Sequence, residues 1–112
     1  MPYDEDLATR IRALLGDTPG VTEKKMFGGL AFLMQGNMAI AASGEGGILV
    51  RVDPAQSDEL VATRGAQVAE MRGRLMSGWL RVDADRLSAD STLAFWVETG
   101  TTFARSLPAK DS

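Results

Sequence analysis

The chain has 112 residues, of which 45% are hydrophobic and 24% are charged, and its twelve basic and fifteen acidic residues give a net charge of −3. This length and composition predict one globular domain over residues 1–112, and they exclude a disordered or fibrous protein. The chain contains no cysteine and no histidine, which excludes disulfides and thiolate metal sites and removes the usual general base.

The N-terminal residues predict a cytoplasmic protein with no membrane partner. Residues 1–6 are acidic, whereas a secretory signal would be basic and then apolar. No run approaches the roughly 20 apolar residues that a membrane span needs.

The first predicted element is an amphipathic helix over residues 4–15. Leu7, Ile11, Leu14 and Leu15 recur at the spacing of one helical face, and Gly16 stands where a glycine commonly ends a helix. Three acidic residues fall in the first turn, where they complement the helix dipole.

Three extended segments follow, over residues 23–35, 38–42 and 48–52. The pair Gly36-Asn37 is typical of a two-residue hairpin turn, and the glycines of residues 43–47 predict a looser turn. The pair Gly28-Gly29 falls inside the first segment, where it indicates a bulge, a bend or a short turn.

Asp53 and Pro54 predict the start of a short helix that runs to residue 63. Strands are expected at residues 67–71 and 79–82, with a turn over residues 72–78 between them. A helix over residues 90–106 closes the domain, and residues 109–112 are expected to be a frayed tail. The stripe expected to face the sheet consists of Leu93, Trp96, Val97, Gly100, Phe103, Ala104 and Leu107.

This order, α-β-β-β-α-β-β-α, predicts an α+β domain of two layers. Its sheet is expected to be mainly antiparallel and five-stranded, with helices covering it.

The sequence predicts no catalytic residues, no metal and no cofactor. The paired acids at Asp58-Glu59 and at Asp83 and Asp85 have the positions of capping and turn residues. The glycines of residues 44–47 lack the third glycine and the following helix of a phosphate loop, so a hairpin turn explains them.

Two surface features have alternative interpretations. The methionines fill the core or form an adaptable stripe that binds a partner. Trp79 belongs to the core, or it forms an exposed aromatic and basic patch that binds protein or nucleic acid; the arginines around it are otherwise ordinary solvated surface. The candidate partner-binding residues are Lys24, Lys25, Arg51, Arg72, Arg74, Trp79 and Arg81.

Several of these segments together resemble a known family. The matching residues run from Tyr3 to Leu14, from Val21 through Met26-Phe27-Gly28-Gly29, over Gly36-Asn37-Met38 and Val50-Arg51-Val52, and then over Gly73-Arg74, Met76, Gly78-Trp79 and residues 96–108. This pattern resembles the N-terminal domain of the TfoX/Sxy family. In it Met26, Phe27, Gly28 and Gly29 form a fold signature, with Met26 and Phe27 expected to anchor the core around a backbone bend.

The resemblance implies an α+β fold similar to the secretion-chaperone-like architecture. It also implies a link to natural competence in bacteria, where full-length members act as transcription co-activators beside a cyclic-AMP-responsive regulator. Those members carry a further C-terminal domain that residues 1–112 do not include, and the resemblance supplies no catalytic residues.

The sequence therefore predicts a non-enzymatic regulatory domain that binds a protein partner, such as a transcription regulator. Self-association through a sheet edge or a helix face is a further expectation. The alternative is a weak nucleic-acid-binding module that uses Arg72, Arg74, Arg81 and Trp79.

Overall fold

The computed structural model describes residues 3–26, 28–71 and 73–108 of the chain. Phe27, Arg72 and the predicted tail 109–112 lie outside the described residues. The elements are α1 Glu5–Leu15, β1 Val21–Met26, β2 Gly29–Met34, β3 Asn37–Ala42, β4 Ile48–Arg51, the 3₁₀ turn η1 Pro54–Gln56, α2 Ser57–Arg64, β5 Gln67–Met71, β6 Arg74–Val82, the 3₁₀ turn η2 Ala84–Arg86 and α3 Asp90–Ser106.

The strands form one six-stranded antiparallel sheet in the order β1-β2-β3-β4-β6-β5. The first four strands follow one another as hairpins, because their turns are short. The chain then passes through α2 to the edge strand β5 and returns as β6 beside β4. The predicted α+β class is confirmed, but the predicted five strands and their order are wrong.

The additional strand arises at Gly28-Gly29, which divides the predicted segment 23–35 into β1 and β2. Gly28 has φ +74°, a backbone conformation that residues with a Cβ atom adopt only with strain. A Cβ at Gly29 would overlap the carbonyl oxygen of Ala42 on β3. The glycine pair therefore allows a tight hairpin that lies close to the neighbouring strand, so that the short turn is the one of the three expectations that the structure shows.

The next hairpin turns one residue earlier than the sequence predicted. Gln35 and Gly36 both have positive φ, at +53° and +84°, which is the requirement of a type I′ turn. Asn37 is instead the first residue of β3 and is 2% exposed. Its Nδ2 donates a hydrogen bond of 2.8 Å to the carbonyl oxygen of Pro108, which ties this hairpin to the chain after α3.

Strand β6 is longer than predicted, because it begins at Arg74 and not at Trp79. The expected turn over residues 72–78 was wrong for residues 74–78, which belong to β6. Gly78 is a strand residue with φ +87°, close to the place where the register of β5 and β6 shifts between Val68 and Ala69. A glycine in a strand interior thus marked a bulge and not a turn.

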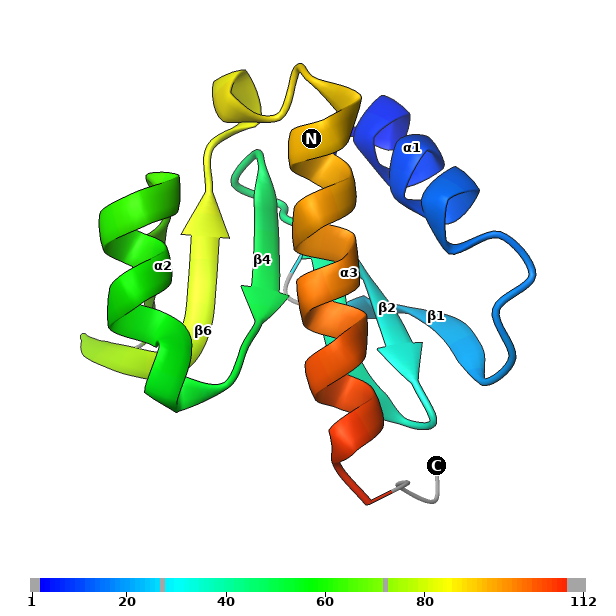
Figure 1. Cartoon of the computed structure of the whole chain (residues 1–112). Helices are drawn as coiled ribbons and strands as arrows, with labels where there is room; N and C mark the ends of the chain where they lie inside the picture. The colour runs from blue at the N-terminus through cyan, green and yellow to red at the C-terminus, as the bar shows by residue number, and fades with distance from the viewer. Residues whose placement is uncertain (1–2, 27, 72, 109–112) are drawn as a thin grey trace.

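The helices cover one face of the sheet, and the main core lies between the two layers (Figure 1). The predicted bounds of the first and last helices are confirmed to within one residue. In α3 the buried residues include Leu93, Trp96 and Val97, and a Cβ at Gly100 would overlap the carbonyl oxygen of Ala39, so this helix lies very close to β3. None of the helices in the described ranges is long and apolar enough to cross a membrane.

Three predicted helix-face residues are less buried than expected, and one of them, Leu107, is half-buried just after the end of α3. Leu14 remains 43% exposed at the rim of a hollow between α1 and α3. Phe103 is half-buried and faces α2, while Thr101 occupies a buried position that the stripe did not include. Thr101 tolerates burial because its hydroxyl donates a hydrogen bond of 2.9 Å to the carbonyl oxygen of Val97.

A second apolar cluster lies on the opposite face of the sheet, which we refer to as the distal face. All of its residues come from strands, and they alternate with residues of the main core, as the period of two along a strand requires. The cluster consists of Met26, Ala31, Leu33, Met38, Ala41, Leu49 and Trp79. Helices α1 and α3 contribute to the main core and not to this cluster.

Candidate functional site

Three of the candidate partner-binding residues meet on the distal face. Arg51 pairs with Trp79 across strands β4 and β6, and Leu49 pairs with Arg81. Residues directly opposite each other in an antiparallel pair point to the same side of the sheet, and Leu49 and Trp79 belong to the distal cluster. We refer to Arg51, Trp79 and Arg81 as the Arg51 cluster.

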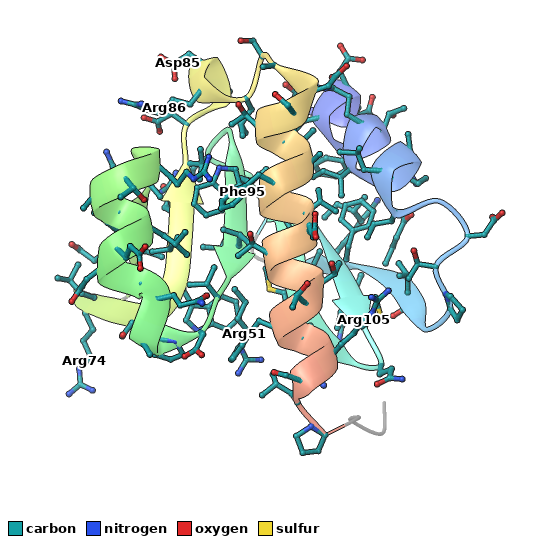
Figure 2. The ribbon with its side chains drawn as sticks, viewed as in Figure 1. Arg51, Arg74, Asp85, Arg86, Phe95 and Arg105 are labelled. Carbon is teal, nitrogen blue, oxygen red and sulfur yellow. The ribbon has the colours of Figure 1, made fainter. Side chains whose placement is uncertain are left out.

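Lys24, Lys25 and Arg74 do not join the Arg51 cluster, and Arg72 lies outside the described residues. Lys24 pairs with Ala31 and so shares the distal face, but β1 is three strands from β4, about 14 Å at the usual strand spacing. Lys25 pairs with Leu30 of the main core and therefore points to the helix-covered side. Arg74 is exposed and extends away from the molecule near the end of the β5–β6 hairpin (Figure 2).

The guanidinium group of Arg51 lies between two aromatic rings. Its Cζ is 5.1 Å from the ring centroid of Trp79 and 5.6 Å from that of Phe103. Cation–π contacts of this length hold a guanidinium in place without neutralising its charge. The sequence gave Phe103 a place in the core and so did not identify it as part of this site.

Arg81 forms an ion pair with Glu45, a residue of the turn between β3 and β4. Nη1 of Arg81 lies 3.2 Å from Oε2 of Glu45, whose side chain is 76% exposed. Exposed pairs of this kind contribute little stability, but Glu45 lowers the positive potential that Arg81 offers to an anion.

Three of the methionines are divided between the main core and the distal face. Met34 lies in the main core, whereas Met26 and Met38 lie on the distal face, where Met38 is 8% exposed and Met26 is half-buried. The sequence analysis did not single out Leu33 and Leu49, which are half-buried there. The runs of apolar residues in β2 and β4 were the available signal, since strands covered on one side only normally alternate with polar residues.

The fold-signature residues act in the packing of two turns. Met26 contacts the distal cluster. The turn at Gly28 lies against Gly44, where an added Cβ would be 2.6 Å from the carbonyl oxygen of Gly28. The described residues of the signature therefore support the β1–β2 hairpin against the β3–β4 turn.

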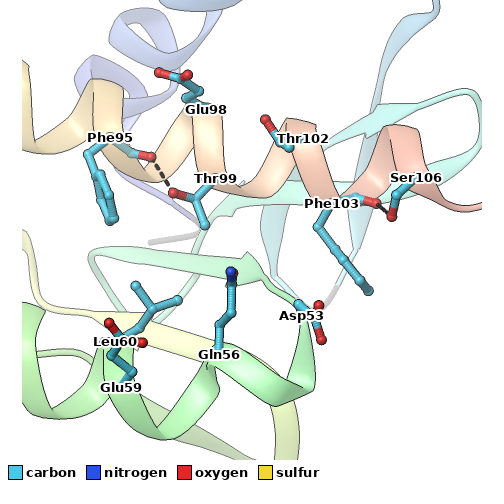
Figure 3. Close-up of a pocket in the computed structure, with 10 residues that line it drawn as sticks. All are labelled: Asp53, Gln56, Glu59, Leu60, Phe95, Glu98, Thr99, Thr102, Phe103 and Ser106. Atoms are coloured by element: carbon cyan, nitrogen blue, oxygen red, sulfur yellow. Dashed lines mark hydrogen bonds between the residues drawn. The ribbon is translucent and has the colours of Figure 1, made fainter.

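A groove with a volume of about 550 Å³ lies between α2 and α3. Phe95, Thr99 and Phe103 point into it from α3, and Gln56 and Leu60 point toward them from the other wall (Figure 3). Asp53, Glu59 and Glu98 complete its rim as exposed carboxylates. Sequence reasoning missed this groove, because its two walls are separated by about thirty residues in the chain.

One ion pair on the helix-covered side perturbs a carboxyl group. Nε of Arg12 on α1 lies 2.7 Å from Oε2 of Glu23 on β1, and Nη2 lies 2.9 Å from Oε1. The hydrogen bonds from Arg12 lower the pKa of Glu23 below its ordinary value, and the opposite charge adds to this shift. The pair joins a sheet edge to α1 and lies apart from the Arg51 cluster.

Within the described ranges no group of three or more acidic, histidine or cysteine side chains converges to hold a metal ion. What the distal face offers is apolar area between guanidinium groups, and such surfaces suit protein contacts.

The comparisons with known proteins agree with the fold. The searches of curated proteins and of solved structures found no match. The family model described as the TfoX N-terminal domain matches residues 13–104 of the 112-residue chain. This range takes in the end of α1, all six strands, the hairpin signature and most of α3. The chain therefore belongs to the TfoX N-terminal domain family.

Proposed function

We propose that this domain is a non-enzymatic regulatory module that binds another protein through its distal face. The observation that carries the proposal is the distal apolar cluster, in which Leu49 and Trp79 are half-buried between Arg51 and Arg81. Aromatic, methionine and arginine side chains are enriched in protein interfaces. Membership of a regulatory domain family supports the same direction.

The charges of the distal face favour a partner surface of complementary charge. Lys24, Arg51 and Arg81 share this face, and Glu45 forms an ion pair with Arg81. A complementary partner surface is apolar at its centre and acidic at its rim. A bacterial transcription regulator with such a surface is the proposed partner, and we also propose a cytoplasmic location, where these regulators act.

Site-specific crosslinking in the native host tests the proposal. The photoreactive amino acid p-benzoylphenylalanine replaces Leu49 on the distal face, and in a control it replaces Leu75, which is 71% exposed on β6. We expect a regulatory protein to crosslink at position 49 and not at position 75. Crosslinking only at position 75, or none at either position, contradicts the proposal.

A nucleic-acid-binding module is the alternative, and the Arg51 cluster is its only structural support among the described residues. Glu45 partly neutralises Arg81, and the whole chain carries a net charge of −3, so we favour the protein partner. The alternative predicts binding of a fluorescent single-stranded oligonucleotide that weakens as salt increases. Salt-dependent binding that is lost in both Arg51→Ala and Arg81→Ala would establish it and displace the first proposal.

A further inference from the structure

The α2–α3 groove is a second surface, which meets the distal face at Arg51, between Trp79 and Phe103. We propose that it binds a basic amphipathic helix of a protein partner. Three properties of the groove suit such a helix, namely its length along α3, its apolar floor and its acidic rim.

The groove follows one complete stripe of α3. Its lining residues on this helix recur at intervals of three and four, which places them on one face. They are Phe95, Glu98, Thr99, Thr102, Phe103 and Ser106. From Phe95 to Ser106 this face extends about 16 Å at the rise of an α-helix. Since the opposite face of α3 packs on the sheet, the helix carries two faces, and an elongated occupant fits the second one.

The floor of the groove is apolar. The side chains of Phe95, Phe103 and Leu60 are half-buried and point into it (Figure 3). Thr99 donates its hydroxyl hydrogen to the carbonyl oxygen of Phe95 at 2.7 Å. Because this hydroxyl is already bonded within α3, Thr99 adds its methyl group to the floor, and the floor favours leucine-like or aromatic side chains of an occupant.

The rim of the groove is acidic, with Asp53, Glu59 and Glu98 along it. None of the three ion pairs found among residues 3–26, 28–71 and 73–108 involves these carboxylates. Positively charged side chains of an occupant would therefore meet carboxylates that have no competing salt bridge in the described structure.

The aromatic rings of the groove also accept guanidinium groups. Cζ of Arg64 lies 3.9 Å from the ring centroid of Phe95, and Arg51 lies over Phe103 at the other end. These arginines reduce the negative charge at the two ends of the groove without entering its lining. Because these two rings already carry guanidinium groups, the rim carboxylates are the groups that suit lysine and arginine side chains on a helix, in the known helix-in-groove mode of recognition.

A designed peptide tests the proposal. The probe is a fluorescent helix of about 18 residues, roughly 27 Å long, with leucines on one face and lysines at all other positions. Its counterpart carries glutamates in place of the lysines. Fluorescence anisotropy is measured with the full chain, and we expect the lysine peptide to bind and the glutamate peptide to show no binding.

Two adjacent residues of α2 provide matched variants. Glu59 lines the groove, whereas Asp58 is exposed and does not line it. We expect Glu59→Lys to weaken binding of the lysine peptide about tenfold and Asp58→Lys to weaken it less than about twofold. Phe103→Ala should weaken it by about tenfold or more through loss of the apolar floor.

Any of three results would overturn the proposal. These are failure of the lysine peptide to bind, equal binding of both peptides, and equal losses of binding in Glu59→Lys and Asp58→Lys. Preferential binding of the apolar dye ANS that is lost in Phe103→Ala, with no binding of the lysine peptide, would instead indicate a small apolar ligand. The two peptides and the variants at Glu59 and Asp58 do not involve Arg51, Leu49 or Trp79, so failure in those measurements leaves the distal-face proposal standing, whereas Phe103→Ala also removes a ring that contacts Arg51.

Discussion

Gly29 is the residue whose replacement we expect to damage the fold most clearly. A Cβ at this position would overlap the carbonyl oxygen of Ala42, which belongs to the backbone of β3 and cannot move as a side chain would. Overpacking of this kind typically costs about 1–3 kcal/mol. We therefore expect Gly29→Ala to lower the free energy of unfolding by about 2–3 kcal/mol, as measured by urea denaturation.

The matched control for Gly29→Ala is Lys24→Ala, a truncation of an exposed side chain in the neighbouring strand. Surface substitutions of this kind usually change stability by less than about 0.5 kcal/mol. A larger loss of stability in Lys24→Ala than in Gly29→Ala would show that the basic pair, and not the glycine pair, supports the hairpin.

The sequence identified several residues of the site but not their relations. Arg51, Trp79 and Arg81 were candidates on chemical grounds, and the structure places them on neighbouring strands. Lys24 and Lys25 point to opposite faces of the sheet, because side chains alternate along a strand. Which lysine points to which face can be assigned only once the pairing of Lys25 with Leu30 is known. Phe103 could not be identified, because a helical stripe does not reveal which of its edges faces a partner helix or solvent.

At the level of elements, the edge strand β1 is joined to α1 by the pair Arg12 and Glu23. Because the pKa of Glu23 is lower in the folded state than in the unfolded state, the pair stabilises the fold above the unfolded pKa of this carboxyl group. This contribution is lost as the pH falls through the lowered folded-state value. Both side chains are partly exposed, so salt weakens the effect.

The test of this connection is the pKa of Glu23 itself. We expect Arg12→Gln to raise the pKa of Glu23 toward its ordinary value, because the hydrogen bonds that lower it are removed. A carboxyl ¹³C NMR titration measures this shift. Arg10→Gln serves as the control, since Arg10 bonds instead to Asp90 and to the carbonyl oxygen of Leu87. An unchanged Glu23 pKa in Arg12→Gln would contradict the account.

The elements themselves were largely predictable, because their signals are local. Asp4 accepts hydrogen bonds from the N–H groups of Asp6 and Leu7, and Asp53 accepts one from Ala55, as capping residues do. The errors came from glycines, whose freedom fits a turn, a bulge or a bend equally well. Gly28-Gly29 proved to be a turn and Gly78 a bulge, and the difference depends on contacts with β3 and β5 that are distant in the chain.

At the scale of the whole molecule, the domain carries two surfaces of contrasting chemistry. The distal face combines apolar side chains with basic ones, whereas the α2–α3 groove combines phenylalanines with an acidic rim. Arg51 contacts aromatic rings of both, Trp79 on one side and Phe103 on the other. If both proposals above are correct, the domain holds two protein segments of different charge at once.

The most direct test of the central claim uses the methionine methyl groups as reporters. Met26 and Met38 belong to the distal cluster, and Met34 lies in the main core. The protein labelled with ¹³C at its methionine methyls is titrated with the partner that crosslinks at position 49. We expect the signals of Met26 and Met38 to shift while that of Met34 stays in place. Binding that leaves Met26 and Met38 unshifted would contradict the assignment of the distal face as the docking surface.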